Sequence, residues 1–148
     1  MGDFKPLDPD YEARVRSSFS RQGLMHTLGV ELVHLAPGEV DLAMRHGPQL
    51  TQQHGYFHAG ATAAIADSAA GYAALSLYPR GVGVLTVEFK INLLRPAEGE
   101  RLIARGRVIK PGRTLTVCRS EVYGERDGRE THVATALFSM ICREGLDD

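Results

Sequence analysis

The sequence predicts an α+β fold in which one antiparallel sheet of about six strands packs on one long helix. Three observations favour this fold. Residues 58–77 form a long run of small, mostly apolar residues, as expected of a buried helix. Six shorter segments are typical of strands, most plainly where apolar and polar residues alternate. The pair Asp127-Gly128, a strong hairpin signal, separates the last two of them.

A short amphipathic helix is predicted near the N-terminus, over residues 9–22. Asp8 is placed as the N-cap and Pro9 as the first helical residue. Apolar side chains then recur at four-residue spacing, and Gly23 stands near the expected end; they are Tyr11, Val15 and Phe19.

Two strands follow this helix, over residues 30–35 and 40–44, with Pro37-Gly38 between them. A polar loop over 46–57 leads to the long helix. Four more strands are predicted after it, and their ranges are 85–93, 102–109, 113–123 and 131–142. Arginines alternate along the second of these and mark its solvent-facing side; they are Arg101, Arg105 and Arg107.

Composition limits the class of protein. The 148 residues form a single domain, 1–148, which is large enough for a hydrophobic core without metal or disulfide support. Lys and Arg number 17 and Asp and Glu 18, so the formal net charge of −1 gives no electrostatic footprint for nucleic acid or an anionic membrane.

We expect a cytoplasmic protein. Cys118 and Cys142 are too few for a disulfide-rich scaffold or a four-ligand zinc site, and free thiols indicate a reducing compartment. Residues 1–16 lack the apolar stretch of a secretory signal. Asp67 interrupts the longest low-polarity run, which makes that run a poor membrane span.

Asp67 is the residue on which the functional argument depends. It is the only acidic or basic side chain between His58 and Leu77. A buried carboxylate without a partner is costly and its pKa rises, so it is retained for a partner or for a function. Two interpretations are open. Asp67 is either a functional carboxylate, or a structural side chain that caps a loop or pairs with an arginine from a strand.

The N-terminus of the same helix is a second candidate. Its first N–H groups carry partial positive charge, and the small residues Ala59 and Gly60 leave them accessible to an oxyanion. Small residues serve close packing on a sheet equally well. Because Asp67 lies about 12 Å along the helix axis from Ala59, one active site using both would need two copies of the chain. A monomer is then expected to be inactive.

These residues resemble hotdog-fold acyl-CoA thioesterases of the PaaI-like group, which is named for phenylacetate degradation. The resemblance spans residues 24–140. It begins with Leu28-Gly29 and continues through Gln52, and an acidic residue, Asp67, stands nine positions after the His that opens the helix. The matching helix opening is His58-Ala59-Gly60, with Ala59 where the family usually has glycine, and a strand residue, Thr86, precedes Pro96-Ala97.

The resemblance implies a role for each of these positions. Asp67 would be the general base or the nucleophile that attacks the thioester, and the backbone N–H of Ala59 would polarise its carbonyl. Gln52 would lie by the thioester or the attacking water, His58 and Gly60 would shape the start of the helix, and Thr86 would help position the water. The substrate would be an acyl-CoA, and the small residues of the helix would leave room for an aryl or medium-length acyl group. The protein would be a homodimer or homotetramer, and no cofactor or metal is expected.

Other chemistry-bearing residues are weaker candidates. Lys110 and Arg113 stand at a turn where they could hold coenzyme A phosphates, although a solvated turn explains them equally well. His54 and His58 are four residues apart without further metal ligands. Neither cysteine has an obvious activating base, and Ser68 lacks the Gly-x-Ser-x-Gly elbow of serine hydrolases.

Two other functions stay open at this point. A hotdog hydratase or dehydratase would act on enoyl or hydroxyacyl thioesters and would need an acid/base pair, commonly His with Asp or Glu, at one centre. A non-catalytic acyl-CoA-binding protein would bind the ligand without turnover.

Overall fold

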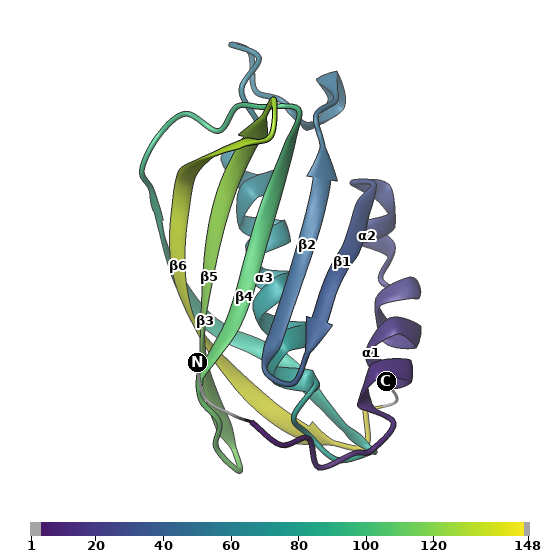
Figure 1. Cartoon of the computed structure of the whole chain (residues 1–148). Helices are drawn as coiled ribbons and strands as arrows, with labels where there is room; N and C mark the ends of the chain where they lie inside the picture. The colour runs from purple at the N-terminus through teal and green to yellow at the C-terminus, as the bar shows by residue number, and fades with distance from the viewer. Residues whose placement is uncertain (1–3, 147–148) are drawn as a thin grey trace.

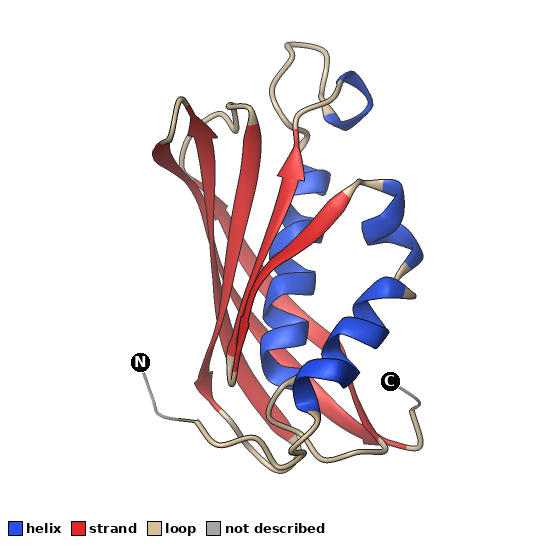
Figure 2. Cartoon of the chain, turned by 45° about the vertical axis from the view of Figure 1, so that its right-hand side comes forward, coloured by secondary structure: helices blue, strands red, loops and turns tan. Residues whose placement is uncertain are grey.

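The computed structural model describes residues 4–146 and confirms the predicted α+β hotdog architecture (Figure 1). Its elements are α1 (Tyr11–Ser20), α2 (Gly23–Thr27), β1 (Val30–Ala36), β2 (Glu39–Arg45), the 3-10 helix η1 (Pro48–Leu50), α3 (Ala59–Leu75), β3 (Val82–Leu93), β4 (Arg101–Lys110), β5 (Leu115–Arg126) and β6 (Arg129–Glu144). The strands form one antiparallel sheet in the order β1-β2-β4-β5-β6-β3. The long helix α3 lies inside the curved sheet, with α1 and α2 on its far side (Figure 2).

The centre of α3 lies very close to the sheet, and a glycine makes this possible. A Cβ atom on Gly106 of β4 would lie 2.2 Å from the backbone oxygen of Ala69. The α3 residues at this contact are Ala69 and Ala70, and both are fully buried. The small residues of α3 therefore set the distance between helix and sheet, and with it the position of the whole helix.

The edge strand β3 contains an irregularity that matters for the site. Its pairing with β6 shifts register between Thr86 and Glu88, as in a β-bulge. Before the shift Thr86 pairs with Met140, and after it Phe89 pairs with Phe138; both partners are buried on the inner face of the sheet. The bulge thus leaves Thr86 facing α3.

The predicted start of the first helix is wrong by two residues. The helix begins at Tyr11, because Asp8 is used elsewhere: its Oδ1 accepts from the backbone N–H of Asp10 at 3.0 Å. The buried Asp8 carboxylate also pairs with Arg14 at 3.4 Å and with Arg80 at 3.4 Å. Burial alone would raise the pKa of Asp8, but the Asp10 N–H and Arg80 hold it below its usual range.

Other element boundaries differ in smaller ways. The first helix ends at Ser20, and Gly23 begins the separate five-residue helix α2, which the sequence did not predict. The turn Asp127-Gly128 is confirmed, with φ of 51° and 71° as the two-residue hairpin requires. The long helix is confirmed over 59–75, within the predicted 58–77.

The outer face of the sheet is charged along β4, as predicted. Each of its three arginines forms an ion pair with a residue of another strand: Arg101 with Glu125 of β5 at 3.0 Å, Arg105 with Glu130 of β6 at 2.7 Å, and Arg107 with Asp41 of β2 at 2.5 Å. Within residues 4–146, no helix is both long and apolar enough to cross a membrane.

The contact at Gly106 yields a stability prediction. Gly106→Ala places a methyl group against the backbone of Ala69, which cannot move without displacing α3, so we expect the free energy of unfolding to fall by about 3 kcal/mol. Gly23→Ala is the matched control, because no atom lies within 4 Å of the added Cβ. Urea unfolding of the three proteins measures the difference; equal midpoints for Gly106→Ala and the wild type would contradict the proposed close contact.

Candidate functional site

Asp67 lies at the middle of α3, on the side of the helix that does not face the sheet centre. It is half-buried, and its Oδ1 accepts a 2.6 Å hydrogen bond from the Thr86 hydroxyl. Thr86 is itself held against the sulfur of Met140 at 3.2 Å. Thr86 therefore connects the carboxylate to the bulged edge strand.

The electrostatics of Asp67 suit a proton acceptor. Burial raises the pKa of its carboxyl group, and the hydrogen bond from Thr86 opposes that rise without cancelling it. Across residues 4–146 the carboxylate forms no ion pair, so the interpretation as a partner for a strand arginine is wrong. A desolvated carboxylate whose pKa is raised is a stronger base than an ordinary aspartate.

A cavity of about 280 Å³ opens beside Asp67, between α1, α3 and β3. Its lining includes Ser68, whose Oγ donates to Gln22 Oε1 at 2.9 Å. Gln22 is the N-cap of the unpredicted helix α2, and it lines this cavity from the junction between α1 and α2. Sequence reasoning missed Gln22, since nothing in a lone glutamine at a helix junction signals a site.

The N-terminus of α3 offers an unused donor. His58 is the N-cap: its Nδ1 accepts from the N–H of Gly60 at 2.8 Å, and its carbonyl accepts from Ala61 and Thr62. The N–H of Ala59 has no acceptor among residues 4–146. Ala59 and Gly60 are exposed, so this N–H can be reached by a ligand oxygen.

Gln52 lies at the same end of α3 as Ala59. Its side-chain Oε1 accepts a hydrogen bond from the backbone N–H of His54, and its backbone N–H donates to the carbonyl oxygen of Tyr56. Both Gln52 and Ala59 line a second cavity, of about 510 Å³, whose other wall is residues 93–97 at the end of β3 and beyond it.

The structure thus divides the predicted site residues into two groups. Asp67 and Thr86 share the smaller cavity, while Gln52 and Ala59 share the larger one, with His58 and Gly60 forming the helix start beside them. Along the helix axis, Asp67 is about 12 Å from Ala59. Within one chain, therefore, the carboxylate and the helix tip do not meet on one substrate carbonyl.

Comparison with known proteins identifies the family. The model of the thioesterase superfamily matches residues 54–131, the stretch that includes the start of α3, Asp67 and Thr86. The chain belongs to the thioesterase superfamily. It is 30% identical to human acyl-coenzyme A thioesterase 13, over 68% of this chain and 71% of that protein.

Solved structures agree with this assignment. A thioesterase family protein from Silicibacter pomeroyi is 50% identical, with a TM-score of 0.89 over 91% of this chain and 99% of that one. The Escherichia coli PaaI protein, from the phenylacetic acid degradation operon, has a TM-score of 0.85 at 20% identity, over 96% of this chain and 99% of that one. The predicted resemblance to the PaaI-like fold is confirmed, and the superfamily member described here is a thioester hydrolase.

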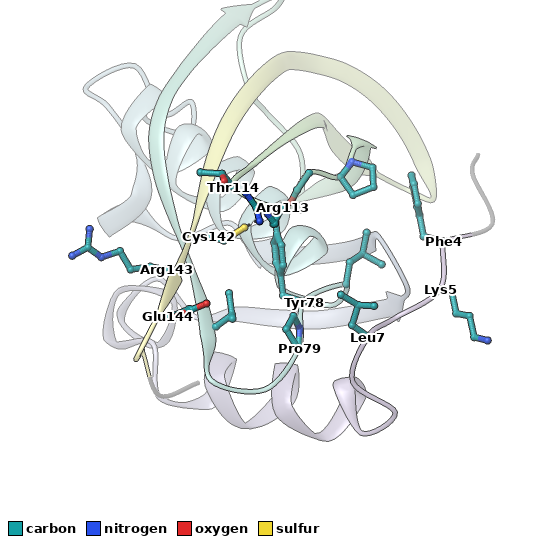
Figure 3. A pocket seen from close by; sticks show the side chains of 14 residues that line it. Phe4, Lys5, Leu7, Tyr78, Pro79, Arg113, Thr114, Cys142, Arg143 and Glu144 are labelled. Atoms are coloured by element: carbon teal, nitrogen blue, oxygen red, sulfur yellow. Dashed lines mark hydrogen bonds between the residues drawn. The ribbon is translucent and has the colours of Figure 1, made fainter.

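Arg113 lies in a different place from either group of site residues. It lines a cavity of about 940 Å³ at the C-terminal end of α3, together with Tyr78 and Phe4, whereas Lys110 does not line it (Figure 3). The charged ends of Lys5 and Arg143, on the rim of this cavity, point outward and away from each other (Figure 3). The basic groups do not converge there on one anion.

The remaining nucleophile and metal candidates find no support in residues 4–146. Cys118 is fully buried, and burial raises the pKa of its thiol to about 12, so it is not a thiolate at neutral pH. His54 contacts the side chain of Gln53, and no group of three metal-ligating side chains occurs in the described part of the chain.

The Thr86 hydrogen bond predicts the pH dependence of this thioesterase. Thr86→Val removes the donor that lowers the pKa of Asp67, so that pKa rises further. If the carboxylate is the reactive form, the acidic limb of kcat/KM against pH moves to higher pH. Thr86→Ser retains the hydroxyl and should retain the wild-type limb. If Thr86→Val and the wild type have the same pH profile, the hydrogen bond from Thr86 does not affect the group whose ionisation controls kcat/KM.

Proposed function

We propose that the protein hydrolyses acyl-CoA thioesters at a site built from two copies of the chain. One copy supplies Asp67 with Thr86, and the other supplies the helix start with Gln52 and the free N–H of Ala59. The observation that carries this proposal is the half-buried Asp67 carboxylate, which opens to a cavity and has one neutral hydrogen-bond donor. Acyl-coenzyme A as the substrate is supported by the name of the human relative.

The residues can carry out the reaction in either of two ways. As a general base, Asp67 takes a proton from water while the water oxygen attacks the thioester carbon. As a nucleophile, it attacks that carbon itself and forms a mixed anhydride that water then hydrolyses. In both, the carbonyl oxygen gains negative charge, which the N–H of Ala59 and the positive end of α3 stabilise. The C–S bond then breaks, and the coenzyme A thiolate leaves and is protonated.

The exposed edge of the sheet supports pairing of two copies. β3 has twelve residues, and among residues 4–146 it pairs only with β6, so its outer edge leaves backbone groups unpaired within this part of the chain. It also carries large apolar side chains that are about half exposed: Leu85, Val87, Phe89 and Leu93. A long, apolar edge of this kind is a template for a second strand.

Charge and geometry favour antiparallel pairing about the middle of β3. With a twofold axis at Phe89, Glu88 of one copy would lie opposite Lys90 of the partner subunit, and the reverse pair would form by symmetry. The Asp67 cavity lies at the 84–86 end of β3 and the Ala59 cavity at the 93–97 end. Antiparallel pairing would therefore bring the Asp67 cavity of one copy beside the Ala59 cavity of the other.

Hydration chemistry is less well supported by this geometry. A hydratase or dehydratase needs an acid/base pair, commonly His with Asp or Glu, and within one chain no histidine is among the described residues that line the Asp67 cavity. The products distinguish the two reactions. Hydrolysis releases a free thiol, which a colorimetric thiol reagent detects, whereas hydration or dehydration changes the enoyl absorbance. The phosphate contacts of Lys110 and Arg113 stay predictions.

Two variants test the shared site. Asp67→Asn keeps the acceptor for Thr86 and removes the charge. Ala59→Pro removes one N–H at the first helical position, where proline is favoured, and His58 already has the extended conformation, ψ 139°, that precedes proline. We expect Asp67→Asn to lower kcat by about three powers of ten or more and Ala59→Pro by about one hundredfold.

Mixing the variants decides whether the site is shared. In a hybrid dimer, one of the two sites receives both intact groups and the other receives neither, so a purified hybrid should recover about half of the wild-type activity. Differential affinity tags allow the hybrid to be isolated after joint refolding. A hybrid no more active than its parents would place each site within one chain.

The stability of Asp67→Asn is an internal control. The pKa of Asp67 is higher in the folded state than in the unfolded state. The free energy of unfolding therefore falls as the pH rises and the carboxyl group ionises. Asp67→Asn should then unfold at the wild-type temperature or above it at pH 8. A large decrease in the Tm of Asp67→Asn would show instead that the Asp67 carboxylate stabilises the folded state.

A further inference from the structure

We infer that the cavity at the C-terminal end of α3 is a second binding site, separate from Asp67, for a free long-chain carboxylate. The alkyl chain would occupy the apolar interior of the cavity, and the carboxylate would stay at its basic mouth. The inference does not depend on the proposed hydrolysis, because none of the residues that line this cavity lines the cavities of Asp67 and Ala59.

Segments that are far apart in the sequence build the walls of this cavity, which measures about 940 Å³ (Figure 3). They are the N-terminal segment 4–7, residues 77–79 after α3, the turn 111–114 between β4 and β5, and the ends of β3 and β6 beside them. Sites for small ligands usually measure about 300–1,000 Å³, so this volume is at the upper end of that range. The cavity therefore has room for a long alkyl chain.

The interior of the cavity is mostly apolar, and its polar groups are already paired. The Tyr78 hydroxyl donates to the carbonyl oxygen of Gly112 at 3.0 Å and shares a second hydrogen bond with Thr116. Burial raises the pKa of Tyr78, so this hydroxyl stays neutral. Such walls require no hydrogen bond from a ligand, which suits an alkyl chain. Apolar side chains make up much of the remaining lining; they are Phe4, Leu7, Leu77, Val82 and Pro111.

The mouth of the cavity carries positive charge. Its basic side chains are Lys5, Arg113 and Arg143, whereas Glu144 is the only acidic one among the described residues that line it. None of the three cations forms an ion pair with another residue of 4–146. The charged ends of Lys5 and Arg143 point outward, so they attract an anion to the mouth rather than into the interior (Figure 3). Because the cations do not converge, they suit a single carboxylate better than a group of phosphates.

Leu7 shows that the mouth is incompletely covered. Its side chain is 70% exposed although it borders an apolar cavity. The segment that carries it is held at both ends. The Leu7 N–H donates to the carbonyl oxygen of Leu77 at 3.3 Å, and a Cβ atom on Gly38 would lie 2.6 Å from the Phe4 ring. An alkyl chain that enters beneath this segment would bury Leu7 and gain apolar contact area.

Cys142 supplies a reporter for binding at this site. It lines the cavity, whereas Cys118, the only other cysteine, is fully buried with a pKa raised to about 12. Alkylation by iodoacetamide, followed by mass spectrometry, should therefore modify Cys142 and leave Cys118 unmodified. Dodecanoate below its micelle concentration should slow the alkylation of Cys142 by about tenfold. Butyrate at the same concentration should not, because only a long chain buries enough apolar area.

The dodecanoate concentration that half-protects Cys142 measures the affinity and tests the charge at the mouth. Dodecyltrimethylammonium has the same chain and the opposite charge, so it should bind about tenfold more weakly. Leu7→Glu brings a negative charge to an exposed position at the mouth and should weaken dodecanoate binding by about tenfold. Arg143→Glu should weaken it by about fivefold.

Arg129→Glu is the matched control for Arg143→Glu. Arg129 is also an exposed arginine of β6 that forms no ion pair within 4–146, but it does not line the cavity, so its reversal should leave the affinity unchanged. Asp67→Asn separates this site from the catalytic one, and it should bind dodecanoate as the wild type does. Loss of protection in Asp67→Asn would place the ligand beside Asp67 instead and overturn the inference.

The remaining outcomes also decide the question. Unchanged alkylation of Cys142 in dodecanoate, or equal dodecanoate affinity in the wild type, Leu7→Glu and Arg143→Glu, would overturn the inference. Protection that rises with protein concentration and not with dodecanoate would assign the cavity to a second copy of the chain. A protein that hydrolyses no thioester but is protected by dodecanoate would retain this site and refute only the proposed hydrolysis.

Discussion

The close contact between α3 and β4 is the constraint on which the rest of the structure depends. Gly106 lets the backbone of α3 reach the sheet, and alanines such as Ala69 and Ala70 keep it there. A helix held so tightly on one side has little freedom to rotate, because a small rotation would drive a Cβ atom into β4. Asp67 and Gly71 lie on another side of α3, and their positions relative to β3 are therefore fixed as well.

The position of Asp67 reflects two opposing demands. A fully buried carboxylate would be protonated and would neither accept a proton nor attack a carbon. A fully exposed one would be solvated and a weak base. Partial burial with a single hydroxyl donor from Thr86 lies between these limits. This arrangement lowers the stability of the folded protein, because a desolvated charge that forms no ion pair within the described chain destabilises the native state. The tight packing of the alanine face offsets it.

The sequence predicted the features that repeat and missed those that depend on tertiary contacts. Alternation gave the strands, and the run of small residues gave α3, because periodicity is a local property. The N-cap assigned to Asp8 was wrong because its carboxylate pairs with Arg14 and Arg80, and Arg80 is far away in sequence. The five-residue helix α2 is too short for a periodic signal, so Gln22 could not be linked to Asp67. The distance of Asp67 from Ala59 along the helix followed from the sequence, but the two separate cavities that these residues line depend on tertiary contacts.

That separation connects the fold to the proposed chemistry. A helix that supplies both the carboxylate and the oxyanion donor cannot use the two on one substrate, since eight residues of rise hold them about 12 Å apart. In the proposed dimer, antiparallel pairing at β3 would bring the Asp67 cavity of one copy beside the Ala59 cavity of the other. The apolar edge of β3, which favours aggregation in a single chain, would then be the element that completes the site. Pairing and catalysis would thus share one cause, and a change that separates the copies should remove activity even where every catalytic side chain is intact.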